Sequence, residues 1–196
     1  MARPKIVVDT ETGGLCPAEH PLTEIAAVNL ETGQVLSAFR PLYISELEAC
    51  DPLALELNHY WSAAERVTDF RHARAIFDTR FVELMAWLQG ATLLAVNPAF
   101  DVEVLEAYSS RLGLPQLEGL RTLAVESLFF GSAGLDVGRD DVPGLSRMCE
   151  MAGVEVAPEH RHTALGDALA TRDIVRWCTG RSKGAARGAG TVERSA

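Results

Sequence analysis

The sequence lacks the features that mark several large protein classes. No apolar run reaches the roughly eighteen residues that a membrane-spanning helix needs, and the N-terminus has no apolar segment that would direct export. The four cysteines are scattered without C-x-x-C pairing, no histidines stand at zinc-finger spacing, and the phosphate-binding pattern G-x-x-x-x-G-K-[ST] is missing. We therefore expect a soluble, cytoplasmic protein with reduced thiols, neither anchored in a membrane nor a P-loop enzyme.

An excess of basic residues is also missing. Lys and Arg number 18 against 27 Asp and Glu, for a formal net charge of −9. A protein that simply coats nucleic acid normally shows the opposite balance, whereas an acidic chain suits a site that collects carboxylates around cations.

The length and apolar content favour one folded domain with a tail. The chain has 196 residues, of which 47% are hydrophobic, enough for a single sizeable core. Apolar periodicity disappears after residue 179, where four basic residues stand against one acidic residue. We expect a domain at 1–179 and a disordered basic tail at 180–196, which is more typical of a solvated terminus than of a phosphate-binding arm.

The first motif is K-I-V-V-D-T-E-T-G-G-L at 5–15. Its β-branched run predicts a buried strand, and Asp9 and Glu11, two residues apart, face the same side of it. Two adjacent carboxylates repel one another unless a cation lies between them, so the motif indicates a divalent-metal site. A strand that runs into a turn with two solvated acids would have the same sequence pattern. The choice between these two interpretations depends on whether further acids lie at the same place.

Periodicity and turn residues predict the other elements. Strands are expected at 24–30, 35–40 and 91–96, and helices at 52–58, 77–89, 101–112, 143–152 and 163–178. The turn at 31–34 joins the second and third strands, giving an antiparallel meander, and 91–96 is expected to run parallel to the first strand. Residues 120–128 fit a strand or a helix, and 129–141 are expected to form a loop.

Three more residues extend the candidate site. Asp101 opens the helix after the 91–96 strand, at the strand end where open α/β folds place ligands. Asp167 lies within the last predicted helix, and His162 precedes it at the loop-to-helix junction. Each has an ordinary alternative: Asp101 as a helix N-terminal acid, Asp167 on a solvated helix face, and His162 as a cap or surface residue.

Together these pieces resemble the three motifs of the DEDDh exonuclease family. The motifs are D-x-E-T-x-G-L at 9–15, N-x-x-F-D at 97–101 and H-x-A-x-x-D-A at 162–168, in the family's order and spacing. That family includes proofreading epsilon-type subunits of DNA polymerase III, ribonuclease T and oligoribonuclease. The resemblance implies a ribonuclease H-like α/β fold, in which a mixed five-stranded sheet with an antiparallel meander and parallel strands is flanked by helices.

The resemblance also assigns roles to residues. It implies that Asp9, Glu11, Asp101 and Asp167 bind two divalent cations, Mg²⁺ or Mn²⁺, and that His162 is the general base. Hard carboxylate oxygens suit these ions, and a histidine titrates near neutral pH. The substrate contacts that it implies are Thr10, Thr12, Gly14, Leu15, His59 and Asn97.

Two details qualify the substrate contacts. Gly13 stands where many family members have Thr, which bears on the grip on the terminal nucleotide. His59 lies beside Trp61, and packing of an aromatic cluster explains this segment as well as substrate contact does.

The sequence thus predicts a two-metal 3′–5′ exonuclease that releases nucleoside 5′-monophosphates from single-stranded or frayed 3′ ends. DNA is favoured over RNA as the substrate, although no residue of the sequence chooses between the two. A polymerase partner or a homodimer is compatible with the family, and no membrane is expected. The alternative is a noncatalytic exonuclease-like module that binds nucleic-acid ends or a polymerase, although such a module would normally have lost a carboxylate.

Overall fold

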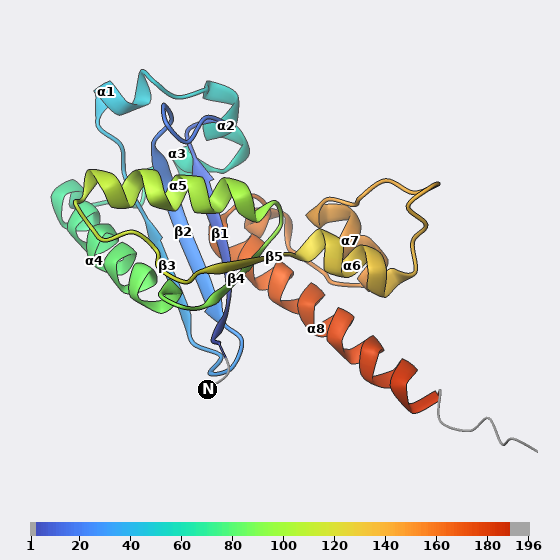
Figure 1. Cartoon of the computed structure of the whole chain (residues 1–196). Helices are drawn as coiled ribbons and strands as arrows, with labels where there is room; N and C mark the ends of the chain where they lie inside the picture. The colour runs from blue at the N-terminus through green and yellow to red at the C-terminus, as the bar shows by residue number, and fades with distance from the viewer. Residues whose placement is uncertain (1–2, 189–196) are drawn as a thin grey trace, which may run out of the picture.

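The fold is built on one five-stranded sheet. A computed structural model of the chain describes the backbone of residues 3–188 and the side chains up to residue 180. The strands are β1 (Lys5–Thr12), β2 (Leu22–Asn29), β3 (Val35–Phe39), β4 (Thr92–Ala95) and β5 (Arg121–Ala124), in the spatial order β3-β2-β1-β4-β5 (Figure 1). This confirms the predicted α/β class and mixed sheet.

The direction of each strand follows from its connection. β1, β2 and β3 form an antiparallel meander, whose second turn contains Gly33 at φ 75°, a conformation that glycine adopts without strain. β1 pairs in parallel with β4, and β4 in parallel with β5, each after a helical crossover. β1 therefore lies at the centre of the sheet, and its carboxyl end meets that of β4.

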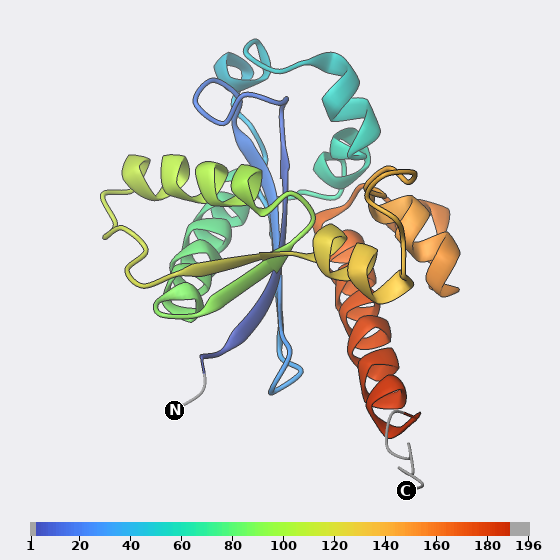
Figure 2. The ribbon, with the colours of Figure 1, turned by 45° about the vertical axis from the view of Figure 1, so that its right-hand side comes forward.

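Helices cover both faces of the sheet, and β1 contributes alternate residues to each side. Ile6 and Val8 join the core formed with α4 (Phe70–Leu88) and α5 (Pro98–Arg111). Val7 joins the core on the other face, formed with α6 (Val125–Ala133), α7 (Leu145–Ala152) and α8 (Ala164–Gly188). Figure 2 shows the sheet nearly edge-on between these two layers. Because both faces are buried, the strand is apolar at consecutive positions until Asp9.

The helices agree with the predicted positions, with several shifts at their ends. α4 begins at Phe70 rather than at 77, because the Asp69 side chain caps it by accepting the His72 N–H at 2.9 Å. α5 begins at Pro98, so Asp101 lies in its first turn and not at its first residue. The ambiguous segment 120–128 is both strand and helix, since β5 ends at Ala124 and α6 begins at Val125.

The loop expected at 129–141 is partly wrong. α6 continues to Ala133, because Phe129 is fully buried in the core beside α8 and holds the helix there. Short elements not foreseen from periodicity complete the chain, because they are too brief to display a repeat: α1 (Ile44–Leu47), α3 (Tyr60–Ala64) and the 3₁₀ turn η1 (Pro158–His160). The short helix predicted at 52–58 is confirmed as α2 (Pro52–Leu57), capped by Asp51.

The predicted boundary at residue 180 falls inside α8. The helix continues to Gly188, which corrects the expectation of an irregular tail for 180–188. Ala, Arg and Lys are good helix formers, and a single glycine costs a helix only about 1 kcal/mol, so Gly180 does not end it. The rest of the predicted tail, 189–196, lies outside the described residues. None of the described helices is long and apolar enough to cross a membrane.

Candidate active site

The site begins at the carboxyl end of β1. Asp9 and Glu11 share the strand parity of Val7, so both carboxylates point toward the layer that contains α8. Thr10 has the opposite parity and is buried on the α5 side. The strand therefore sends acids to one side of its end and hydroxyl groups to the other.

Asp167 reaches the same place from α8. One carboxylate oxygen from each of Asp9, Glu11 and Asp167 can be chosen so that all three atoms lie within 4.8 Å of one another. α8 packs against β1 and β2, which brings a residue 156 positions after Glu11 beside it. Among the described residues this is the one group of His, Cys, Asp and Glu with spacing suited to a metal ion.

Asp101 lies beside this group rather than within it. It is only 4% exposed, and one carboxylate oxygen accepts a hydrogen bond from the Thr10 hydroxyl at 2.9 Å. Its charge acts on Asp9, and so it belongs to the same electrostatic cluster. The structure thus brings together the four acids that were predicted, from β1, α5 and α8.

The carboxylates are held in the protein at the cost of charge repulsion. Burial raises the pKa of Asp9 well above its usual range, and the neighbouring carboxylates, Asp101 first among them, raise it further. Burial also raises the pKa of Glu11 to about 9, with Asp167 as its strongest charged neighbour. Burial raises the pKa of Asp101 to about 7, although the hydrogen bond from Thr10 acts in the opposite direction.

This electrostatic state fits a divalent cation. The group offers only oxygen donors, with no thiolate or imidazole in it, which is the donor set preferred by Mg²⁺ and Mn²⁺. A cation would favour the ionised form of each acid and offset the repulsion that burial intensifies.

His162 lies at the entrance to α8. Burial raises the pKa of Asp167, while interaction with His162, through its charge and then through a hydrogen bond from its backbone, acts in the opposite direction. The side chain is exposed and, with Asp9 and Asp167, lines a cleft of about 1370 Å³. A solvent-accessible histidine therefore lines the same cleft as two of the carboxylates.

Local backbone strain marks three of the predicted residues. Among the described residues, the non-glycine residues with positive φ are His59, Asn97 and His162, at 55°, 54° and 56°. His59 and Asn97 each directly precede a helix, and His162 precedes α8 by two residues. Such conformations are uncommon for side chains with a Cβ and tend to concentrate at functional sites.

The wall of the cleft is formed by α7 and the segment that leads to α8. Arg147 and Arg161 are its cationic side chains, and Glu150 and Glu155 are acidic ones. Arg147 pairs with Glu150 at 2.5 Å, whereas Arg161 donates from Nε to the Val156 carbonyl oxygen at 3.3 Å. The sequence offered no motif for these arginines, because only the packing of α7 beside α8 places them at the cleft.

The other predicted substrate contacts occupy the loop after β1 and its neighbours. Leu15 is 90% exposed, and His59 and Asn97 are also exposed, so all three side chains are accessible to a ligand. Gly14 has φ 157°, and a Cβ there would lie 2.5 Å from the His20 ring. The loop conformation thus depends on glycine at this position.

The threonine hydroxyls are used inside the protein. Thr10 donates to Asp101, and Thr12 donates to the Gly14 carbonyl oxygen at 2.6 Å. Both side chains are buried and neither lines the cleft. The glycine at 13 also has a local reason, since a Cβ at that position would lie 2.3 Å from the Cys50 sulfur.

Two glutamates near the carboxylate cluster were not predicted from the sequence as site residues. Glu24 on β2 is the register partner of Glu11, and its Oε2 accepts the Ala164 N–H at 3.0 Å. Glu126 on α6 accepts the Asn97 N–H at 3.1 Å through Oε1. Glu24 is the one charged residue of β2, which was a visible signal for it, whereas Glu126 had none.

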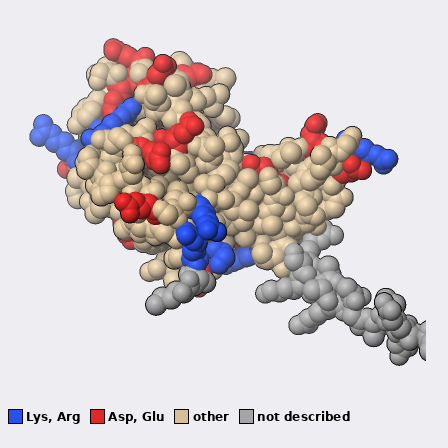
Figure 3. All heavy atoms as spheres, in the orientation of Figure 1, with Lys and Arg blue, Asp and Glu red and all other residues tan. Residues whose placement is uncertain are grey.

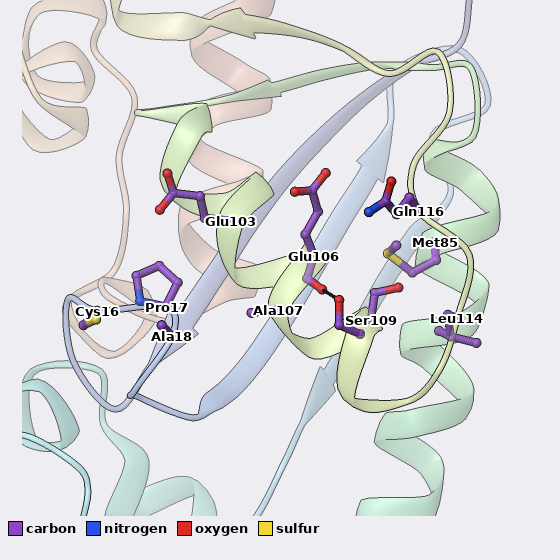
Figure 4. Close-up of a pocket in the computed structure, with 11 residues that line it drawn as sticks. Cys16, Pro17, Ala18, Met85, Glu103, Glu106, Ala107, Ser109, Leu114 and Gln116 are labelled. Carbon is purple, nitrogen blue, oxygen red and sulfur yellow. Dashed lines mark hydrogen bonds between the residues drawn. The ribbon is translucent and has the colours of Figure 1, made fainter.

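A second, smaller pocket lies away from the carboxylates. Its volume is about 450 Å³, and it is enclosed by the loop after β1, by α5 and by the segment that follows α5 (Figure 4). Glu103 and Glu106 project from α5 at its edge, and Cys16 lies on the opposite loop. None of the predicted site residues lines it.

Charge on the surface is dispersed. On the face shown in Figure 3, acidic side chains lie over α5 and over the α1–α2 segment, and basic side chains stand in separate small groups. On this face the described residues form no continuous basic strip of the kind that tracks a long duplex.

Comparison with known proteins agrees with this geometry. A family model described as exonuclease (RNase_T) matches residues 6–175. The chain belongs to this exonuclease family. The match runs from β1 into α8 and includes all four acids and His162.

Relatives of this exonuclease domain occur within larger proteins. The chain is 25% identical to the DNA polymerase III subunit epsilon of Pasteurella multocida, over 90% of this chain and 68% of that protein. It is 27% identical to a DNA polymerase III subunit epsilon-like protein of Rhodobacter capsulatus, over 86% of this chain but only 22% of that protein.

The fold of the exonuclease domain also occurs in solved structures. E. coli exonuclease I in complex with a dT13 oligonucleotide matches with a TM-score of 0.68 at 17% identity, over 95% of this chain and 43% of that chain. At this identity the likeness concerns the fold alone.

Proposed function

We propose that this protein is a divalent-metal-dependent 3′–5′ exonuclease. It would hydrolyse phosphodiester bonds at the 3′ end of single-stranded or frayed nucleic acid and release nucleoside 5′-monophosphates. The observation that carries the proposal is the convergence of Asp9, Glu11 and Asp167 within 4.8 Å, beside a cleft that also contains His162.

The proposed metal ligands are Asp9, Glu11, Asp101 and Asp167. Two Mg²⁺ or Mn²⁺ ions held there would neutralise charge on the scissile phosphate and on the leaving oxygen and make water nucleophilic at neutral pH. Asp9, Glu11 and Asp167 form one close group, and Asp101 would join it from α5, where the Thr10 hydroxyl donates a hydrogen bond to its carboxylate. The raised pKa values of these buried acids support a role in which a cation is part of the working site.

His162 is the proposed general base. It would accept the proton of the attacking water at a ring nitrogen and then lose it to solvent, to which the exposed side chain has access. Its backbone has φ 56°, and it lines the same cleft as Asp167, which supports this role.

Single-stranded or frayed DNA is the proposed substrate. The solved relative named above was crystallised with a DNA oligonucleotide, and two relatives carry names of DNA polymerase III subunits. Arg147 and Arg161 line the cleft, where they would contact the phosphates of a bound strand, while a continuous basic strip is missing from the face described above. A polymerase partner and a homodimer both remain predictions, which the mass of the purified protein with and without polymerase would separate.

The test is digestion of matched 5′-labelled single-stranded DNA and RNA. We expect a ladder that shortens from the 3′ end with Mg²⁺ or Mn²⁺, faster on DNA, and that disappears with EDTA and in Asp9→Ala. Folded wild-type protein that binds oligonucleotides but yields no ladder with either ion would refute the proposal and favour a noncatalytic end-binding module.

A further inference from the structure

We propose that Glu24 and Glu126 are positioning residues, each of which fixes one of the two helices that deliver Asp167 and Asp101 to the carboxylate cluster. This inference rests on the proposed function. Neither glutamate belongs to the three recognised motifs, and neither is among the proposed metal ligands.

Glu24 connects the sheet to α8. It lies opposite Glu11 on the neighbouring antiparallel strand, and the two side chains share the face toward α8. Its Oε2 accepts the N–H of Ala164, the first residue of α8, at 3.0 Å. The first N–H groups of a helix have no partner within it, so this carboxylate fills a place that the helix leaves open.

The start of α8 is thus held at two points. Thr163 accepts the Gly166 N–H through its hydroxyl at 3.1 Å, as an N-cap does, while Glu24 holds Ala164 from the sheet. Asp167 follows Ala164 by three residues, less than one helical turn. The distance between Asp167 and β1 therefore depends on the Glu24 contact.

Glu126 makes the equivalent contact for α5. Its Oε1 accepts the N–H of Asn97 at 3.1 Å, and Asn97 is the N-cap of α5 with φ 54°. Asp101 is in the first turn of that helix. The other oxygen of Glu126 is buried and makes no hydrogen bond with the described residues, so the Asn97 N–H is the hydrogen-bond donor that the structure gives this carboxylate.

The Glu24 and Glu126 contacts have the same proposed effect, which is to fix a helix that carries a metal ligand. A metal site tolerates little displacement of its ligands, and groups that orient the ligands affect metal affinity almost as strongly as the ligands do. Asp9 and Glu11 are placed by the central strand itself, whereas Asp167 and Asp101 come from helices that can move relative to the sheet. Each helix has one glutamate that accepts the N–H at or next to its first residue.

The test compares Met and Gln at each position. Gln keeps an acceptor oxygen and Met removes it at similar size, and Glu31→Met, an exposed acid beyond the end of β2, serves as the control for lost charge. We expect Mn²⁺ affinity, measured by calorimetry on the protein without substrate, to fall about 10–100-fold in E24M and E126M and by no more than about threefold in E24Q and E126Q. E31M should bind Mn²⁺ as the wild type does.

Amide hydrogen exchange supplies a readout that does not depend on metal or activity. The Ala164 amide should exchange faster in E24M but not in E126M, and the Asn97 amide should show the reverse. The proposal would be overturned if the Gln variants lost as much Mn²⁺ affinity as the Met variants. It would also be overturned if Mn²⁺ affinity and amide exchange were unchanged in both Met variants. Failure of the wild type to degrade nucleic acid, with these effects intact, would refute the proposed function alone.

Discussion

Gly166→Ala should lower kcat strongly without unfolding the protein. Gly166 lies in the first turn of α8, one residue before Asp167. A Cβ at this position would lie 1.8 Å from the His160 carbonyl oxygen and 2.9 Å from the Thr163 hydroxyl. Backbone atoms cannot rotate away as a side chain can, so the segment that carries His162 must move.

The size of the movement follows from the contact. Real Cβ atoms essentially never approach a heavy atom closer than 3.0 Å, so the His160 carbonyl must retreat by at least about 1.2 Å from its 1.8 Å position. His162 is two residues further along and moves with it. A misplacement of about 1 Å at a catalytic group can cost about 100-fold in rate, and we expect a loss of that order in kcat.

Stability should change much less than activity. Alanine is favoured over glycine inside a helix by about 1 kcal/mol, which offsets part of the strain at this site. Gly180→Ala is the matched control on the same helix, because a Cβ there meets no atom within 4 Å. It should raise the melting temperature slightly and leave kcat unchanged.

The assay is steady-state digestion of a 5′-labelled oligonucleotide together with thermal unfolding of both variants. A folded G166A protein with kcat within about threefold of the wild type would refute the reasoning, because the His160 carbonyl would then have no influence on the position of the proposed base, His162.

Three further predictions concern the carboxylates, the cleft and the base. Metal-free protein should lose thermal stability as the pH rises from about 5 to about 9, because burial raises the folded pKa of Glu11 from 4.5 to about 9 and the folded state then binds more protons than the unfolded state. E11Q should flatten this dependence of stability on pH, and Mn²⁺ should raise the melting temperature most near pH 9. The same pH dependence in E11Q as in the wild type would contradict the assignment. R147A and R161A should each weaken binding of a single-stranded oligonucleotide about three- to tenfold, with kcat unchanged, and should lower the slope of log affinity against log salt concentration by about 0.7. R80A, on α4 in the opposite layer, should bind the oligonucleotide as the wild type does. Fluorescence anisotropy at several salt concentrations would check this, and an equal loss in all three variants would argue against binding in the cleft. H162A should lower kcat by about 10²–10⁴-fold with Mn²⁺ and oligonucleotide affinity retained, and a parallel loss of Mn²⁺ affinity would instead make His162 a ligand.

Much of this molecule can be read from local patterns. Signals that act over a few residues predict the meander, the central strand and most helices. They are the apolar run before Asp9, the glycine turn at 33, the N-cap at Asp51 and the glycine that follows Gln89. The proximity of the first two motif acids is also predicted locally, because the alternation of side chains along a strand puts Asp9 and Glu11 on one face.

Other features depend on contacts between distant segments. No local pattern indicates that Glu24 reaches the N-terminus of α8, 140 residues later, or that Glu126 holds the turn at Asn97. The extent of α6 follows from burial of Phe129 against α8, and the need for glycine at 166 follows from a carbonyl group that the chain folds against it. Side-chain type and spacing thus predict which residues form the carboxylate cluster, whereas the packing of helices onto the sheet specifies how those residues are held in place. Positions within about an ångström are set by contacts across the fold and not along the chain.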